Sequence, residues 1–222
     1  MKGTNKTKLL FSLACLLLII LAGLMFSCLR PADERRILVE ATGDTAVVSA
    51  WERRGEKWRE VFRASEGYVG RSGVIDPQHK QEGDGATPTG EYEMYRSFGT
   101  EDRPETALSF THVGVDDVWV DDPDSRYYNQ YVHEDAGIKK DWKSAEELSR
   151  LNRAYKYAIV VEYNTHPVVP GKGSAIFLNL SDGHSTAGDI AVPEEDMLRF
   201  LKFVQPGDKI VIRAAQAAGS AV

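Results

Sequence analysis

One stretch of this chain reads KQEGDGATPTG, at residues 80–90, and combines three glycines with a proline and several charged or hydroxyl side chains. Glycine adopts backbone conformations closed to other residues, and proline cannot continue a helix or a central strand. The stretch therefore predicts a tight loop. It resembles a phosphate cradle only superficially, because no strand-to-helix transition and no Gly-Lys-Ser/Thr sequence follow. We interpret it as a turn that gives the backbone room beside a cleft.

β-structure is predicted on both sides of this loop. Upstream, the apolar runs 37–41 and 46–51 flank Thr-Gly-Asp-Thr at 42–45, which is a hairpin signal. A second turn at 53–56 leads into a short mixed strand at 58–62. Further strands are expected at 91–96, 117–121, 157–163, 174–180 and 208–213.

Few helices are expected. Residues 144–147 read Ser-Ala-Glu-Glu, which has capping-box spacing and predicts a short helix. Pro193 and the three acids after it are typical of a helix start, and apolar residues then follow at helical spacing up to residue 204. The pattern predicts one mainly β domain over residues 37–213, followed by a flexible tail at 214–222.

The composition is that of a folded, acidic protein. The chain has 222 residues, of which 42% are hydrophobic and 27% charged. Because residues 1–28 hold three lysines and no acid, 24 basic side chains face 33 acidic ones in the rest of the chain. Nucleic-acid binding depends on Lys and Arg that neutralise phosphates, so we expect no nucleic-acid partner.

The two cysteines, Cys15 and Cys28, both lie in or beside an N-terminal apolar segment. The body of the chain therefore has no internal disulfide, no thiolate zinc site and no cysteine nucleophile.

Residues 1–28 are typical of an export signal or membrane anchor. A basic leader at 1–8 precedes an apolar run at 9–26, which as a helix would span roughly 27 Å. The run ends in Met-Phe-Ser-Cys at 25–28, which resembles a lipoprotein box with Cys28 as the lipidated residue. A lipoprotein, an uncleaved anchor and simple cleavage all remain open. Each places the body outside the cytoplasm, in the cell envelope, with residues 29–36 as a short linker.

Further motifs follow the 80–90 loop in a fixed order. They are Asp-Asp-Pro at 121–123, Tyr-Asn at 128–129 and at 163–164, Gly-Ser-Ala-Ile-Phe-Leu at 173–178, and Thr-Ala-Gly at 186–188. The ordered set resembles the bacterial L,D-transpeptidase catalytic domain, in the branch that carries K-x-E-G-D-G-x-T-P-x-G. The resemblance covers residues 37–213 and implies a mainly β, sandwich-like fold with a few short helices. It also implies peptidoglycan stem peptides as partners, cross-linked through an acyl-enzyme on a cysteine.

Two positions depart from the family pattern. The resemblance implies a histidine after the Ile-Phe-Leu strand and a cysteine after Thr-Ala-Gly, where this chain has Asn179 and Asp189. An Asn amide cannot accept a proton at neutral pH, and a carboxylate is a weak attacker of amides. The backbone around Gly188, two residues after Thr186, still suits an oxyanion pocket. We therefore expect a catalytically impaired family member.

The resemblance also implies a set of residues that bind the substrate. These are Lys80, Glu82, Asp84, Thr87, Ser174 and Phe177. Asp182, His184 and Asp189 have a spacing only weakly typical of a metal site, and we expect neither a metal nor a cofactor.

Three functions stay open at this point. The chain could be an impaired L,D-transpeptidase homologue that still binds stem peptides, or an active envelope hydrolase or transferase that uses Asp189 as acid or base. It could also be a purely structural envelope lipoprotein.

Overall fold

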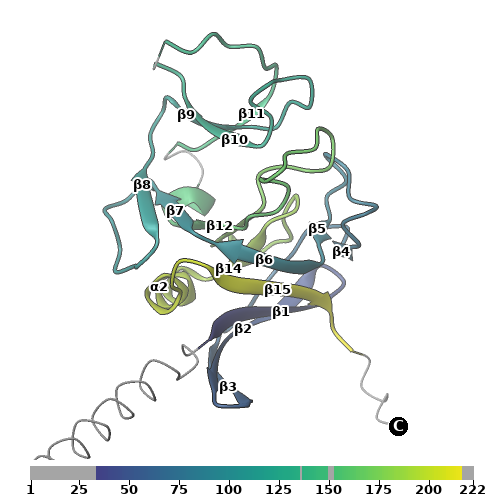
Figure 1. Cartoon of the computed structure of the whole chain (residues 1–222), viewed down its shortest axis with the longest axis vertical. Coiled ribbons are helices and arrows are strands. Elements are labelled where there is room, and N and C mark those ends of the chain that lie inside the picture. Colours follow the sequence, from purple (N-terminus) through teal and green to yellow (C-terminus); the bar gives the residue numbers. More distant parts are fainter. Residues whose placement is uncertain (1–33, 136, 150–152, 217–222) are drawn as a thin grey trace, which may run out of the picture. The chain divides into compact units, whose positions relative to one another are not determined.

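In the computed structural model of the protein, the described residues are 34–135, 137–149 and 153–216 (Figure 1). Both cysteines, the apolar run at 9–26 and residues 217–222 of the predicted tail lie outside these ranges. Within the described ranges, no helix is long and apolar enough to cross a membrane. Export, anchoring and lipidation of Cys28 therefore stay predictions.

The first sheet pairs strands from both ends of the described chain. Its order is β3 (Lys57–Arg63), β2 (Thr45–Arg54), β1 (Arg35–Thr42), β15 (Asp208–Ala214) and β6 (Gly90–Met94). β1 and β15 run parallel, and the other neighbours run antiparallel. Ile37 and Val39 of β1 share one face of the sheet, because alternate residues of a strand point the same way, and both are fully buried; Leu38, on the other face, is also buried. The predicted hairpin and the last predicted strand are confirmed.

The second sheet packs with the first around one hydrophobic core. Its order is β14 (Ile190–Val192), β13 (Phe177–Leu180), β12 (Ala158–Val160), β7 (Arg96–Gly99) and β8 (Ser109–His112). Ile210 of β15, Leu178 of β13 and Phe200 of the helix α2 (Glu194–Phe203) belong to the same buried cluster. The sandwich-like, mainly β fold predicted from the sequence is confirmed, as is the helix that follows Pro193.

A smaller sheet has its own apolar cluster. Its order is β10 (Gln130–His133), β9 (Asp117–Val120) and β11 (Ala145–Glu147). The buried residues of this cluster are Val118, Val120 and Val132 of the sheet and Trp142, which precedes β11. Two further short strands, β4 (Val74–Ile75) and β5 (Thr87–Pro88), pair in parallel, and a short 3-10 helix, η1 (Arg153–Lys156), precedes β12.

The structure corrects the prediction of a helix at 144–147. Residues 145–147 form β11, which pairs antiparallel with β9, so that Glu146 lies opposite Trp119. The capping-box spacing is a local preference, and pairing with a distant strand overrides it. The predicted strand 91–96 is divided between β6 and β7, and the strand predicted at 174–180 begins only at Phe177.

Asn129 connects three segments that are distant in sequence. Its Nδ2 donates to the carbonyl oxygens of Tyr163 at 3.1 Å and Asn164 at 2.8 Å. Its Oδ1 accepts from Trp119 Nε1 at 2.8 Å and from the Ala175 amide at 3.0 Å. The side chain is almost completely buried, and its backbone has a φ of 55°, which Asn tolerates better than most residues.

We expect Asn129→Ala to lower the free energy of unfolding by about 3 kcal/mol, because it leaves several buried donors and acceptors unpaired. Urea denaturation of the full-length protein followed by tryptophan fluorescence measures the loss. Gln130→Ala is the control, since the Gln130 side chain is exposed and should matter by no more than about 0.5 kcal/mol. Equal stability of the two variants would contradict the role assigned to Asn129.

Candidate functional site

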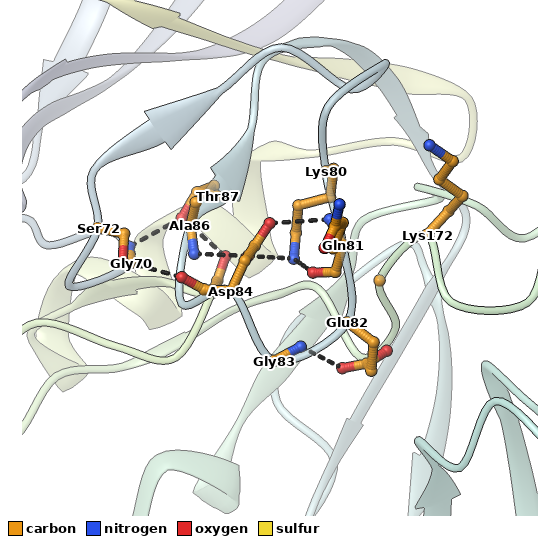
Figure 2. Close-up of polar contacts among 12 residues, drawn as sticks. Gly70, Ser72, Lys80, Gln81, Glu82, Gly83, Asp84, Ala86, Thr87 and Lys172 are labelled. Atoms are coloured by element: carbon orange, nitrogen blue, oxygen red, sulfur yellow. Dashed lines mark hydrogen bonds and ion pairs between the residues drawn. The ribbon is translucent and has the colours of Figure 1, made fainter.

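The loop at 80–90 is organised around the carboxylate of Asp84 (Figure 2). Asp84 Oδ1 accepts from Lys80 Nζ at 2.7 Å and from the Ala86 amide at 2.9 Å. Its Oδ2 accepts from the Gln81 amide at 2.9 Å. Burial alone would raise the pKa of Asp84, but these hydrogen bonds and the Lys80 charge hold it below its ordinary value. Lys80 and Asp84 thus stabilise the loop, and each is the main partner for the charge of the other.

Glu82 of the same loop points toward a different set of partners. Its Oε2 accepts from Tyr128 Oη at 2.5 Å and from Ser174 Oγ at 2.7 Å, and its Oε1 accepts from the Gly83 amide at 3.2 Å. Burial and the hydrogen bond to Glu82 raise the pKa of Tyr128 well above its ordinary value. Two of the residues assigned to substrate binding from the sequence, Glu82 and Ser174, therefore contact each other.

Thr87 joins this loop to the turn at 186–189. Thr87 Oγ1 donates to the Gly188 carbonyl oxygen at 2.7 Å and accepts from the Gly70 amide at 2.9 Å. Within the turn, Thr186 Oγ1 donates to the Asp189 carbonyl oxygen at 2.7 Å and accepts from the Gly188 amide at 3.1 Å. The turn is thus fixed from both sides, and the Gly188 amide is engaged by a neighbouring hydroxyl.

Asn179 and Asp189 are hydrogen-bonded to each other. Asn179 lies on β13, and Asp189 immediately precedes β14, which runs parallel to β13. Asn179 Nδ2 donates to Asp189 Oδ2 at 2.7 Å, and the Phe177 amide donates to Asp189 Oδ1 at 2.8 Å. The Phe177 ring itself is fully buried and packs edge-on against Phe98 and Trp119. Phe177 therefore contacts the site through its backbone.

The carboxyl group of Asp189 has a strongly shifted pKa. Burial raises the pKa of Asp189 to about 8, and the nearby charge of Glu146 adds to this effect. The hydrogen bonds from Phe177 and Asn179 act in the opposite direction and are outweighed. Asn179 is 2% exposed, and its Oδ1 has no hydrogen-bond partner among the described residues.

Two pockets meet at Asp189, and together we call them the cleft. The larger has a volume of about 670 Å³, and the smaller one about 190 Å³. Both are lined by Glu146, Tyr155, Ala187 and Asp189. The larger pocket also contains Asn179 and Thr186, and the smaller one Lys80, Glu82, Ser174 and Gly188.

Glu146 and Tyr155 also line the cleft, and the sequence gave no indication that these two residues belong to it. Tyr155 Oη donates to Glu146 Oε2 at 3.1 Å. Burial raises the pKa of Glu146, with further contributions from Asp121 and Glu82, and burial also raises the pKa of Tyr155 well above its ordinary value. Local spacing predicts a helix around Glu146, and no motif of the sequence connects either residue to Asp189.

Among the described residues, no group of three or more His, Cys, Asp and Glu side chains is arranged to hold a metal ion. Asp182 and His184 both line the larger pocket beside Asp189, as neighbours of the turn.

Comparison with solved structures gives two similarities. One is to a mutant of Pgp2, a helical cell shape determining protein from Campylobacter jejuni, at 17% identity and a TM-score of 0.48. It covers 83% of this chain and 48% of that chain. The other is to Mycobacterium tuberculosis L,D-transpeptidase 1, at 14% identity and a TM-score of 0.37, covering 81% of this chain and 62% of that one.

A comparison with curated protein sequences gives no match. Comparison with family models does give one. Residues 35–212, which include the cleft, α2 and all the strands except the last two residues of β15, match the model of the L,D-transpeptidase catalytic domain, YkuD. The chain belongs to the L,D-transpeptidase catalytic domain family.

Proposed function

We propose that this chain is a cell-envelope protein that binds peptidoglycan stem peptides in its cleft and does not transfer them. Membership in the L,D-transpeptidase family supports the choice of ligand. The observation that carries the proposal is the state of Asp189, whose two carboxylate oxygens are held by the Phe177 amide and the Asn179 side chain. A group fixed in this way at the centre of the cleft is suited to contact a ligand and poorly suited to attack it.

The chemistry of the family explains why transfer should be lost. Acyl transfer through a covalent intermediate needs a good nucleophile and a base beside it. By resemblance, the positions of Asn179 and Asp189 would hold that pair, and residues 35–212 contain no cysteine that could replace the nucleophile. The Asn179 amide donates to Asp189 and cannot remove a proton.

Binding does not need the nucleophile, because contacts made equally in the ground state and the transition state give affinity without rate. The larger pocket, of about 670 Å³, is of the size at which proteins bind small ligands. Glu82, Ser174 and Thr186 remain in the walls of the cleft.

A second function, acid–base hydrolysis of an envelope peptide or glycan, is favoured by one observation. The pKa of Asp189 is raised to about 8, and groups that exchange protons near neutral pH are typical of acid–base catalysts. We prefer the binding function because both oxygens of Asp189 already have fixed donors.

We expect the unmodified full-length protein, in detergent, to bind purified peptidoglycan sacculi without releasing terminal D-alanine from tetrapeptide stems. Co-sedimentation measures the first property and chromatography of the products the second. Release of D-alanine that Asp189→Asn abolishes would contradict the proposal and favour the hydrolase. Failure to bind sacculi would favour a purely structural lipoprotein.

The double variant Asn179→His with Asp189→Cys should acquire a reactive thiolate–imidazolium pair. We expect it to form a one-to-one covalent adduct with a carbapenem, seen as a mass increase of the intact protein, whereas the unmodified protein forms none. Asp189→Cys alone is the matched control and should react at least about tenfold more slowly, since it lacks the base. A folded double variant without adduct would show that the cleft differs from the family in further ways.

We also propose that the N-terminus anchors the protein and that Cys28 is lipidated. Cys28→Ala should then prevent lipidation and signal removal, so that the protein migrates as the larger precursor on a denaturing gel. Cys15→Ala is the control and should process normally. Unchanged migration and membrane partition of Cys28→Ala would contradict lipidation and support an uncleaved anchor.

A further inference from the structure

A second pocket, separate from the cleft, lies at the edge of the first sheet that is formed by β6. Its volume is about 600 Å³, close to that of the larger pocket of the cleft. The lining comes from β6, from the link between β6 and β7, from segment 162–166 after β12 and from Lys209 of β15. Among the described residues, none lines both this pocket and the cleft. We call it the edge pocket.

Tyr95, which links β6 to β7, gives the edge pocket a flat apolar surface. Its side chain is 42% exposed. The ring is nevertheless fixed, because its Oη donates to Glu93 Oε2 at 2.8 Å and the ring lies beside Gly207, where an added Cβ would be 3.6 Å from it. An aromatic ring that is held in place and still exposed is suited to pack against the carbon-bound hydrogens of another ring.

A bidentate ion pair gives the same pocket a fixed polar surface. Arg96 Nε and Nη2 donate to the two carboxylate oxygens of Glu162, each at 2.9 Å. The guanidinium group of Arg96 also lies 5.5 Å from the centre of the Trp119 ring, and the Glu162 amide donates to the Glu93 carbonyl oxygen at 3.1 Å. The pair is therefore positioned before any ligand arrives, and Arg96 Nη1 takes no part in it.

The charges of the edge pocket favour a neutral ligand. Besides the bidentate pair, Lys209 Nζ lies 3.4 Å from Glu91. The remaining titratable acid of the lining, Glu93, accepts the hydrogen bond from Tyr95, and His166 is the other titratable base. An ionic ligand would have to compete with the existing pairs. Hydroxyl and amide groups do not, because they can donate to and accept from side chains that stay paired.

We propose that the edge pocket binds a neutral saccharide, with a sugar ring packed on Tyr95 and its hydroxyl groups bonded to Arg96 and Glu162. A sugar combines an apolar ring face with many groups that donate and accept, which matches the two surfaces of the pocket. The inference rests on the proposed function, and it names the glycan chain of peptidoglycan as a second part of the polymer that this protein recognises.

One segment connects the edge pocket to the cleft. Glu162 lines the edge pocket, and Ser174 lines the cleft. Between them, Asn164 Nδ2 donates to the Gly173 carbonyl oxygen at 2.8 Å. Since the two sites share no lining residue, glycan and stem peptide do not compete for the same side chains. Binding of both parts would give the intact polymer a higher affinity than the stem alone.

Calorimetry with chitotetraose, a neutral oligosaccharide of N-acetylglucosamine without a stem peptide, tests the inference on the full-length protein in a detergent that has no sugar head group. We expect binding whose affinity changes by less than about twofold between low and high salt, because the charges of the pocket are already paired. Tyr95→Ala should weaken it at least about tenfold, and Tyr95→Phe, which keeps the ring, by no more than about threefold.

Tyr131→Ala is the matched control. Tyr131 is also an exposed tyrosine whose Oη donates to a carboxylate, that of Asp117, but it lies on β10 and outside the edge pocket. This variant should bind chitotetraose within about twofold of the unmodified protein. Tyr95→Ala should likewise keep its affinity for tetrapeptide stems within about twofold, which shows that its cleft is intact, and should bind sacculi more weakly.

The outcomes separate this inference from the proposed function. No binding of chitotetraose by the unmodified protein, or equal binding by the unmodified protein and Tyr95→Ala, would overturn the saccharide site and leave stem binding in the cleft untouched. Loss of stem binding in a folded Tyr95→Ala variant would also overturn it, since the edge pocket would then receive peptide. Failure of the unmodified protein to bind stems and sacculi, with chitotetraose still bound, would overturn the proposed function alone.

Discussion

The hydrogen bonds of Asn129 are the constraint on which the shape of the cleft depends. This one buried amide fixes Trp119 of the small sheet, the Ala175 amide that leads into β13, and the carbonyls that follow β12. Ala175 is itself held at a φ of 52°, which a non-glycine residue adopts only when its surroundings require it. Because β13 carries both Phe177 and Asn179, the position of the Asp189 carboxylate follows from this arrangement.

A second connection runs through apolar contacts. The Phe177 ring lies about 5.0 Å from those of Phe98 and Trp119, so the second sheet and the small sheet share one aromatic cluster. The backbone amide of the same residue donates to Asp189. One residue thus packs the core with its side chain and positions the site with its main chain, which explains why the charged cleft lies directly against a close-packed interior.

The parts of the structure that could be predicted are those determined by residues close together in the sequence. The hairpin at 37–51 and the helix after Pro193 depend on alternation, turn residues and capping within a few positions. The strand β11 could not be predicted, because its pairing with β9 depends on residues more than twenty positions away. For the same reason the sequence indicated Asn179 and Asp189 through a motif, but gave no sign of Glu146 and Tyr155.

The hydrogen bond between Asn179 and Asp189 constrains which substitutions the protein can accept at these two positions during evolution. Each side chain is the hydrogen-bond partner of the other, so a substitution at one position alters what is tolerated at the second. A single exchange at position 189 would leave a buried amide without its acceptor, and one at position 179 would leave a buried carboxyl group without one of its donors. The two sites are therefore expected to vary together.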